Sequence, residues 1–281
     1  MDSNQINRCD SIALSCSKQK FNSVQELSLC LTSELETEKE WAYVFAKWCS
    51  YSLSYTPRHY VSSGNMALKK GKVVCQGYSL LAQEYFTCLG MYCKYIVGDS
   101  KTSVEEIGKK LNLQQHAWNA IKIDDQLLLF DFTWSASAYS VSSKKYVSRF
   151  DPSYLFCSPF EFYLLGHFPR DEWNLFMKCL SCKREYINNP IYHKFAVQDS
   201  ILTQATFKSN YRGKVKISTK QIDPNNIQVG YYSNKNQSIL ILDPILYTYR
   251  DKKMIVKPKY FNKSKEAVLF VDYKMIQSIN R

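Results

Sequence analysis

The chain contains Cys75, His116 and Asp131, in that order. Together, these three residue types can attack an amide. A thiolate attacks an amide carbonyl when its cysteine lies beside a base, preferably at a helix N-terminus, where the dipole favours the anion. A third group must orient the imidazole, fix its tautomer and stabilise its charged form. The order and spacing of these residues therefore predict a cysteine–histidine–aspartate site.

The sequence around the three residues predicts elements that bring them together. KVVCQGYSLLAQEYFTCLG is typical of a tight turn that opens into a helix at Cys75. HAWNAIKI and QLLLFDFTW are short β-rich runs separated by Asp124-Asp125, which predicts an antiparallel hairpin. In that hairpin, His116 and Asp131 would lie side by side.

Each residue also has a plain structural interpretation. A cysteine in an apolar helix is more often an inert core residue than a nucleophile. A lone histidine followed by tryptophan is usually structural as well. The order Cys75, His116 and Asp131, with each residue at the edge of a regular element, favours the chemical interpretation.

The same stretches resemble the transglutaminase-like superfamily, over roughly residues 37–176. ALKKGKVVCQGYSLLAQEYFTCLGMYCKYIVG, HAWNAIKI and LLLFDFTW are similar to the family's strings around its nucleophile, base and acid. YLFCSPFEFYLLGHFPRDEWNLF is similar to the segment that follows the catalytic core in the kyphoscoliosis peptidase group.

The resemblance implies that Cys75 is the nucleophile, His116 the general base and Asp131 the orienting acid. It also implies a papain-like layout, in which a helix carries the cysteine against an antiparallel sheet that carries the histidine and the aspartate. The chain departs from the pattern at Val73-Val74, where many members have Gly-Val before the cysteine, and this substitution crowds the approach to the thiol.

Further side chains are expected to complete the site. The backbone N–H of Cys75 would stabilise an oxyanion, and Trp48 is the candidate for a second donor, with packing as its alternative role. Gln76 follows the nucleophile and could bond the neighbouring loop. Trp118 and Trp134 would wall the cleft and keep it dry.

No metal or other cofactor is expected. Cys179 and Cys182 form an isolated CxxC, without the second pair that a zinc site needs. No run of alternating acidic residues forms a calcium loop, so activity should not require calcium. His167, in GHFPRDEW, matches a motif of the same group, and we expect it to be a structural histidine.

The periodicity of the chain predicts an α+β protein with two domains. We expect a loose lead-in over residues 1–22, a transglutaminase-like domain of helices packed on an antiparallel sheet over 23–198, and a small immunoglobulin-like β-sandwich over 199–281. Capping pairs mark two helix starts in the larger domain, Ser23 with Glu26 and Thr37 with Glu40. Short β-rich runs separated by turn signals fill the last segment.

The net charge of +12 is concentrated near the C-terminus. Residues 201–281 hold 15 Lys and Arg against 5 Asp and Glu, a balance of +10. Such a segment is either a solvated surface or a binding surface for an acidic protein or filament. No nucleic-acid-binding motif accompanies the charge, so nucleic acid is not expected as a partner.

Two classes of function follow from these observations. The chain is either a thiol-dependent amide hydrolase or acyltransferase, or a catalytically silent scaffold that binds partner proteins such as cytoskeletal ones. All three candidate residues are present, which favours the enzyme.

The composition and the N-terminal sequence bear on where the protein works. No run of 18 apolar residues predicts a transmembrane helix, and the first residues do not resemble a signal peptide. The ten cysteines form no compact framework, which favours a reducing compartment. We therefore expect a cytoplasmic protein, with export and removal of a leader as the alternative.

Overall fold

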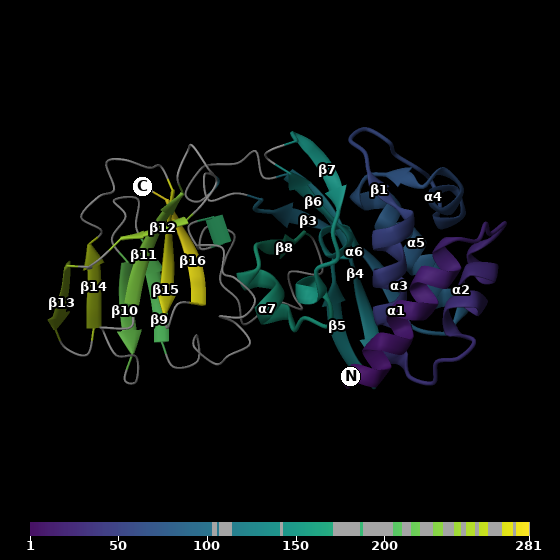
Figure 1. Cartoon of the computed structure of the whole chain (residues 1–281), viewed down its shortest axis with the longest axis horizontal. Helices are drawn as coiled ribbons and strands as arrows, with labels where there is room; N and C mark the ends of the chain where they lie inside the picture. The colour runs from purple at the N-terminus through teal and green to yellow at the C-terminus, as the bar shows by residue number, and fades with distance from the viewer. Residues whose placement is uncertain are drawn as a thin grey trace. The chain divides into compact units, whose positions relative to one another are not determined.

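The structure is a computed structural model that describes residues 1–102, 106, 114–140, 143–170 and 186–187, and the strands between 205 and 280. The chain forms two compact units (Figure 1). The first contains Met1–Gly98, Gln115–Pro159 and Pro169–Phe176, and the second contains Asp99–Gln114, Phe160–Phe168 and Met177–Arg281. The expected boundary between residues 198 and 199 lies outside the described residues and stays a prediction.

Helices and strands both occur in the first 170 residues, which confirms the α+β class. The helices are α1 (Ser3–Ser17), α2 (Val24–Thr32), α3 (Glu38–Ser52), α4 (Gly64–Lys70), α5 (Cys75–Cys88), α6 (Phe132–Ala136), α7 (Pro159–Leu164) and the 3₁₀ helix η2 (Pro152–Tyr154). The strands are β1 (Ser54–Tyr55), β2 (Lys72–Val73), β3 (Cys93–Ser100), β4 (Gln114–Ile123), β5 (Gln126–Phe130), β6 (Ser137–Ser140), β7 (Lys145–Ser148) and β8 (His167–Pro169).

The expectation of a loose lead-in is wrong, because α1 occupies most of residues 1–22. Asp2 and Gln5 form a capping box at its start, a signal that was present in the sequence but not used. The buried face of α1 consists of small side chains, Cys9, Ala13 and Cys16. The helix is more polar on average than α2 and α3, so its apolar face stands out less in the sequence.

Side-chain links fasten α1 to the helices that follow it. Arg8 pairs with Glu40 on α3, whose side chain is almost fully buried. Cys16 forms a disulfide with Cys30 on α2. The N-terminal residues are therefore part of the first unit's core.

The predicted helix starts at Ser23 and Thr37 are confirmed. Thr37 and Glu40 form a full capping box at α3. Ser23 caps α2 by accepting a hydrogen bond from the backbone N–H of Glu26, but the Glu26 carboxylate bonds Asn22 instead of closing the box. The resulting α3 packs its aromatic residues into the core, where Phe45 stacks on Tyr85 of α5 at a centroid distance of 4.4 Å.

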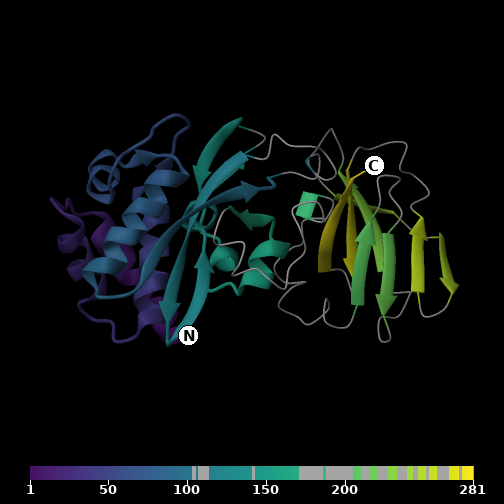
Figure 2. The ribbon, with the colours of Figure 1, turned by 180° about the vertical axis from the view of Figure 1, so that it is seen from behind.

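The predicted hairpin between HAWNAIKI and QLLLFDFTW is confirmed. Strands β4 and β5 pair antiparallel, with Asn119 opposite Phe130. The turn residues Asp124 and Asp125 both have positive φ, at 49° and 62°, as a two-residue hairpin turn requires. These strands belong to a four-stranded sheet of order β5-β4-β3-β8, and Figure 2 shows the hairpin from behind.

Residues 205–280 contain eight described strands in two sheets. The strands are β9 (Ala205–Ser209), β10 (Val215–Thr219), β11 (Ile227–Tyr232), β12 (Ile239–Leu242), β13 (Leu246–Arg250), β14 (Lys253–Lys257), β15 (Glu266–Val271) and β16 (Lys274–Asn280). One sheet has the order β13-β14-β10-β9 and the other β12-β11-β15-β16, with antiparallel neighbours. The predicted β character is confirmed, whereas the immunoglobulin-like sandwich stays a prediction.

Within the described residues, no helix has the length and the apolar character needed to cross a bilayer.

Candidate active site

Cys75 is the first residue of α5, as the sequence predicted. Its side chain is half-buried. The residue before it, Val74, gives no side-chain hydrogen bond to the helix start. The positive end of the helix dipole therefore acts on the sulfur without a capping side chain in between, which stabilises a negative charge there.

The residues before the nucleophile pack into the interior. Val73 and Val74 are both buried. A Cβ atom added at Gly77 would lie 2.5 Å from the Cβ of Val73, so the start of α5 rests directly on this valine. This close approach at Gly77 is made by Val73, which stands where many members of the family have glycine.

This packing makes Gly77 the most sensitive position in the first turns of α5. Alanine normally favours a helix over glycine by about 1 kcal/mol, but the overlap with Val73 involves an atom that cannot rotate away. We expect Gly77→Ala to lower the free energy of unfolding by about 1–3 kcal/mol, measured by denaturant titration. Gly90→Ala is the comparison, because a Cβ there meets no atom within 4 Å and only the positive φ of 73° opposes it. An equal or smaller loss for Gly77→Ala would show that Val73 moves aside.

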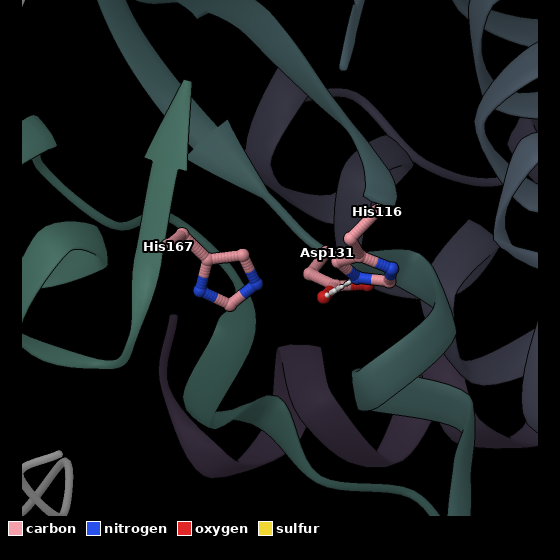
Figure 3. A group of neighbouring side chains, drawn as sticks. All are labelled: His116, Asp131 and His167. Carbon is pink, nitrogen blue, oxygen red and sulfur yellow. Dashed lines mark hydrogen bonds and ion pairs between the residues drawn. The ribbon is translucent and has the colours of Figure 1, made fainter. Parts of the chain in front are cut away.

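His116 on β4 and Asp131 after β5 lie side by side, in the places that the hairpin prediction gave them. The Nε2 atom of His116 lies 2.6 Å from Oδ2 of Asp131, and both side chains are buried (Figure 3). The other carboxylate oxygen, Oδ1, accepts hydrogen bonds from the backbone N–H groups of Thr133 (2.9 Å) and Trp134 (3.0 Å). Asp131 therefore orients His116 with one oxygen and caps α6 with the other.

The charge state of His116 depends on this carboxylate. Burial lowers the pKa of His116, but the Asp131 carboxylate and the hydrogen-bonded Cys75 side chain outweigh burial and raise the pKa to about 10. Because Nε2 is bonded to Asp131, the Nδ1 atom is the one left for Cys75. At neutral pH the imidazole is then protonated between a carboxylate and a sulfur.

The raised pKa predicts how stability should vary with pH. The pair contributes stability that is complete below the ordinary histidine pKa of 6.5 and is lost as pH rises through about 10. We expect the difference in unfolding midpoint between the wild type and His116→Gln to shrink from about pH 7 to about pH 11. Thermal melts of both proteins across that range measure it, and a difference that stays constant would contradict a protonated His116.

Two of the predicted tryptophans flank the histidine. Trp134 stacks on His116 at 5.1 Å between ring centroids, and the buried Trp118 lies at 6.0 Å. Both placements fit the expected walls of the site. Trp48 is buried in the core and stacks on Phe45 at 6.3 Å, so its observed contacts are packing contacts.

The other predicted residues have simpler surroundings. Oε1 of Gln76 accepts a hydrogen bond from the backbone N–H of Val61 at 3.4 Å, which ties the predicted neighbouring loop to α5. His167, drawn in Figure 3, is buried and stacks on Phe162 at 3.9 Å, and its structural role stays a prediction. Cys179 and Cys182 lie outside the described residues.

Asn119 is a positioning residue that the sequence analysis missed. Its Nδ2 atom donates to the backbone oxygen of Ser79 on α5 at 3.0 Å. Since Asn119 lies on β4, this bond ties the strand that carries His116 to the helix that carries Cys75. A buried asparagine in the apolar HAWNAI run was the available signal, because a buried amide requires a partner.

Known proteins were then compared with the chain. No family model matches it. Human kyphoscoliosis peptidase is 25% identical over 179 residues, which cover 61% of this chain and 27% of that protein. Mouse kyphoscoliosis peptidase is 26% identical over 129 residues, covering 45% and 19%. The chain therefore spans about a quarter of the human relative's length.

Two solved structures are similar to the chain at lower sequence identity. A structure described as a cysteine protease from Cytophaga hutchinsonii has a TM-score of 0.34 and 15% identity, covering 47% of this chain and 43% of the other. A structure described as a TGase has a TM-score of 0.30 and 16% identity, covering 47% and 33%. The sequence relatives confirm the predicted resemblance to the kyphoscoliosis peptidase group.

Proposed function

We propose that this chain, which resembles the kyphoscoliosis peptidases, is a cysteine-dependent amide hydrolase or acyltransferase. The observation that carries the proposal is the buried His116–Asp131 pair, 2.6 Å between Nε2 and Oδ2, with Cys75 at the start of α5 contributing to the raised pKa of the same imidazole. A buried ion pair contributes little net stability by itself. Its position against a thiol at a helix start is what favours a chemical role.

The first chemical step follows from this geometry. The Cys75 sulfur attacks the carbonyl carbon of an amide, and the new oxyanion forms near the backbone N–H at the start of α5. The carbon–nitrogen bond then breaks, and His116 gives its Nδ1 proton to the leaving amine. The product is a thioester between the substrate acyl group and Cys75.

The second step regenerates the thiol. Water or an amine attacks the thioester, His116 accepts a proton from the attacking atom, and the carbon–sulfur bond breaks. Water makes the reaction a hydrolysis, and an amine makes it an acyl transfer. Asp131 stabilises the protonated imidazole in both steps.

The two ends of α5 provide the test, because each carries a free cysteine. Cys88 is exposed at the helix C-terminus, and burial together with Glu84 raises its pKa. Cys75 is less exposed but lies at the positive end, beside His116. We expect iodoacetamide at pH 7 to alkylate Cys75 about tenfold or more faster than Cys88, as measured by peptide mapping over time.

The same experiment decides between the enzyme and the silent scaffold. Faster labelling of Cys88 would follow from exposure alone and would contradict a primed nucleophile. Cys75→Ala should retain the wild-type unfolding midpoint but lose both release of peptides from casein and incorporation of a fluorescent amine into it. Equal activity of Cys75→Ala and wild type would reject Cys75 as the nucleophile.

The proposed partner is a protein or peptide substrate. We further propose that the +10 balance of residues 201–281 favours acidic proteins or filaments as partners. The cytoplasmic location stays a prediction, and the Cys16–Cys30 disulfide weighs against it, since disulfides persist mainly in oxidising compartments.

A further inference from the structure

A group of tyrosines lies next to the start of α5. Four tyrosines, called here the tyrosine platform, occur on β1, the loop after it, β6 and β7: Tyr55, Tyr60, Tyr139 and Tyr146. Tyr146 packs against Tyr55 at 4.4 Å and against Tyr139 at 5.2 Å between ring centroids. The platform therefore joins β1 to the β6–β7 hairpin (Figure 1).

Backbone pairing brings the platform next to the candidate nucleophile. Tyr55 on β1 pairs with Val73 on β2 in a parallel register. Cys75 begins α5 two residues after Val73. Burial, then Cys75, Tyr146 and Tyr60, raise the pKa of Tyr55 to about 12, which agrees with a close cluster around the thiol.

Much of the platform is open to solvent. Tyr60 is 66% exposed, Tyr139 53% and Tyr146 44%. All four residues of β7 are exposed. Of these, Tyr139 and Tyr146 are in ring contact. Exposed tyrosines in such contact are typical of binding surfaces, because each ring offers a large apolar face at a small entropy cost and a hydroxyl at its tip.

The segments that carry the platform are basic. The segments that carry it, 54–63, 71–74 and 137–150, contain no Asp or Glu. They contain five Lys and Arg, all exposed: Arg58, Lys72, Lys144, Lys145 and Arg149. A positive rim around aromatic faces attracts polypeptides that are acidic and carry aromatic side chains.

We propose that the tyrosine platform binds the substrate polypeptide of the Cys75 site, and that it selects acidic segments containing aromatic residues. Calling this polypeptide a substrate rests on the proposed function, but its binding to the platform does not require turnover. Stacking on Tyr146 and its neighbours holds the aromatic side chains, and the basic rim attracts the carboxylates. The bound segment then lies over Cys75.

Protection of Cys75 from iodoacetamide tests the proposal on the full chain. The probe is a random copolymer of glutamate and tyrosine, and its effect is the slowing of Cys75 alkylation relative to Cys88. Protection by a polymer bound elsewhere, including at residues 201–281, would not depend on Tyr146, so the variants below separate it from binding at the platform. We expect half-protection at about a tenfold lower concentration than with polyglutamate, and no protection by a copolymer of lysine and tyrosine.

Variants separate the aromatic part of the surface from its basic part. Tyr146→Ala should raise the half-protection concentration about tenfold, and Lys144→Glu with Lys145→Glu should raise it and weaken its dependence on salt. Tyr92→Ala and Lys122→Glu are the matched controls. Both side chains are exposed. The backbone N–H of Lys122 donates to the backbone oxygen of Tyr92, which follows the C-terminal end of α5, whereas Cys75 lies at the N-terminal end.

The outcomes are distinct from those of the proposed function. Polyglutamate that protects as well as the copolymer, or control variants that act like Tyr146→Ala, would overturn the platform. Equal protection by inorganic polyphosphate that is insensitive to Tyr146→Ala would show a site for anions in general and would also overturn it. Protection does not require Cys75 to react faster than Cys88, so the loss of one proposal leaves the other measurable.

Discussion

Asp131→Asn is expected to leave the protein folded and to reduce kcat/KM by about three to four orders of magnitude. The carboxylate has two tasks: Oδ1 accepts from Thr133 and Trp134, and Oδ2 holds Nε2 of His116. Asparagine has a single carbonyl oxygen, and the two N–H donors of α6 retain it. Its amide group then faces His116 as a donor, so Nε2 must accept and the imidazole cannot remain protonated there.

The measurement is the rate of peptide release from casein and of amine incorporation into it, together with the alkylation rate of Cys75. Asp125→Asn is the matched control, because Asp125 is an exposed hairpin carboxylate that pairs with Lys122. It should have wild-type rates. An Asp131→Asn variant as active as the wild type would remove Asp131 from the site.

The local elements of the site could be predicted because their signals are local. A turn that leads into a helix predicted the position of Cys75. The Asp124-Asp125 turn predicted the pairing that places His116 beside Asp131, since the register of a two-residue hairpin follows from its turn. Each of these steps needs only short-range sequence.

The other features depend on contacts between distant segments. Asn119 bonds Ser79 across 40 residues, and no local pattern indicates which amide a strand will bond to which helix. Tyr55 and Tyr146 are 91 positions apart, and they meet because β1 packs against β7. The chain has 21 tyrosines, but only the packing of β1 against the β6–β7 hairpin brings Tyr55, Tyr139 and Tyr146 together.

Helix α1 was not predicted for a different reason. It is more polar on average than α2 and α3, so its apolar face stands out less in the sequence. Besides packing on α3, it is held by the Arg8–Glu40 and Lys47–Asp10 ion pairs and by the disulfide to α2. These links join α1 to later helices, so the N-terminal segment by itself does not reveal them.

The disulfide leads to the largest expected effect on stability. Cys16 and Cys30 are 14 residues apart, and closing a loop of this length stabilises a folded chain by about 3 kcal/mol through the entropy of the unfolded state. We expect the double variant Cys16→Ala with Cys30→Ala to lower the free energy of unfolding of the first unit by about that amount. Denaturant titration followed by tryptophan fluorescence is the measurement, because Trp41 and Trp48 lie on α3, against which α1 packs.

A reducing agent provides the internal control. Dithiothreitol should destabilise the wild type to the level of the double variant and should leave the double variant unchanged. The ratio of Cys75 to Cys88 alkylation should be the same in both proteins below the transition, because α5 keeps its own contacts with α4 and α6. A wild type whose unfolding is insensitive to dithiothreitol would show that Cys16 and Cys30 are thiols in solution. The first unit would then hold α1 through packing and the Arg8–Glu40 and Lys47–Asp10 pairs.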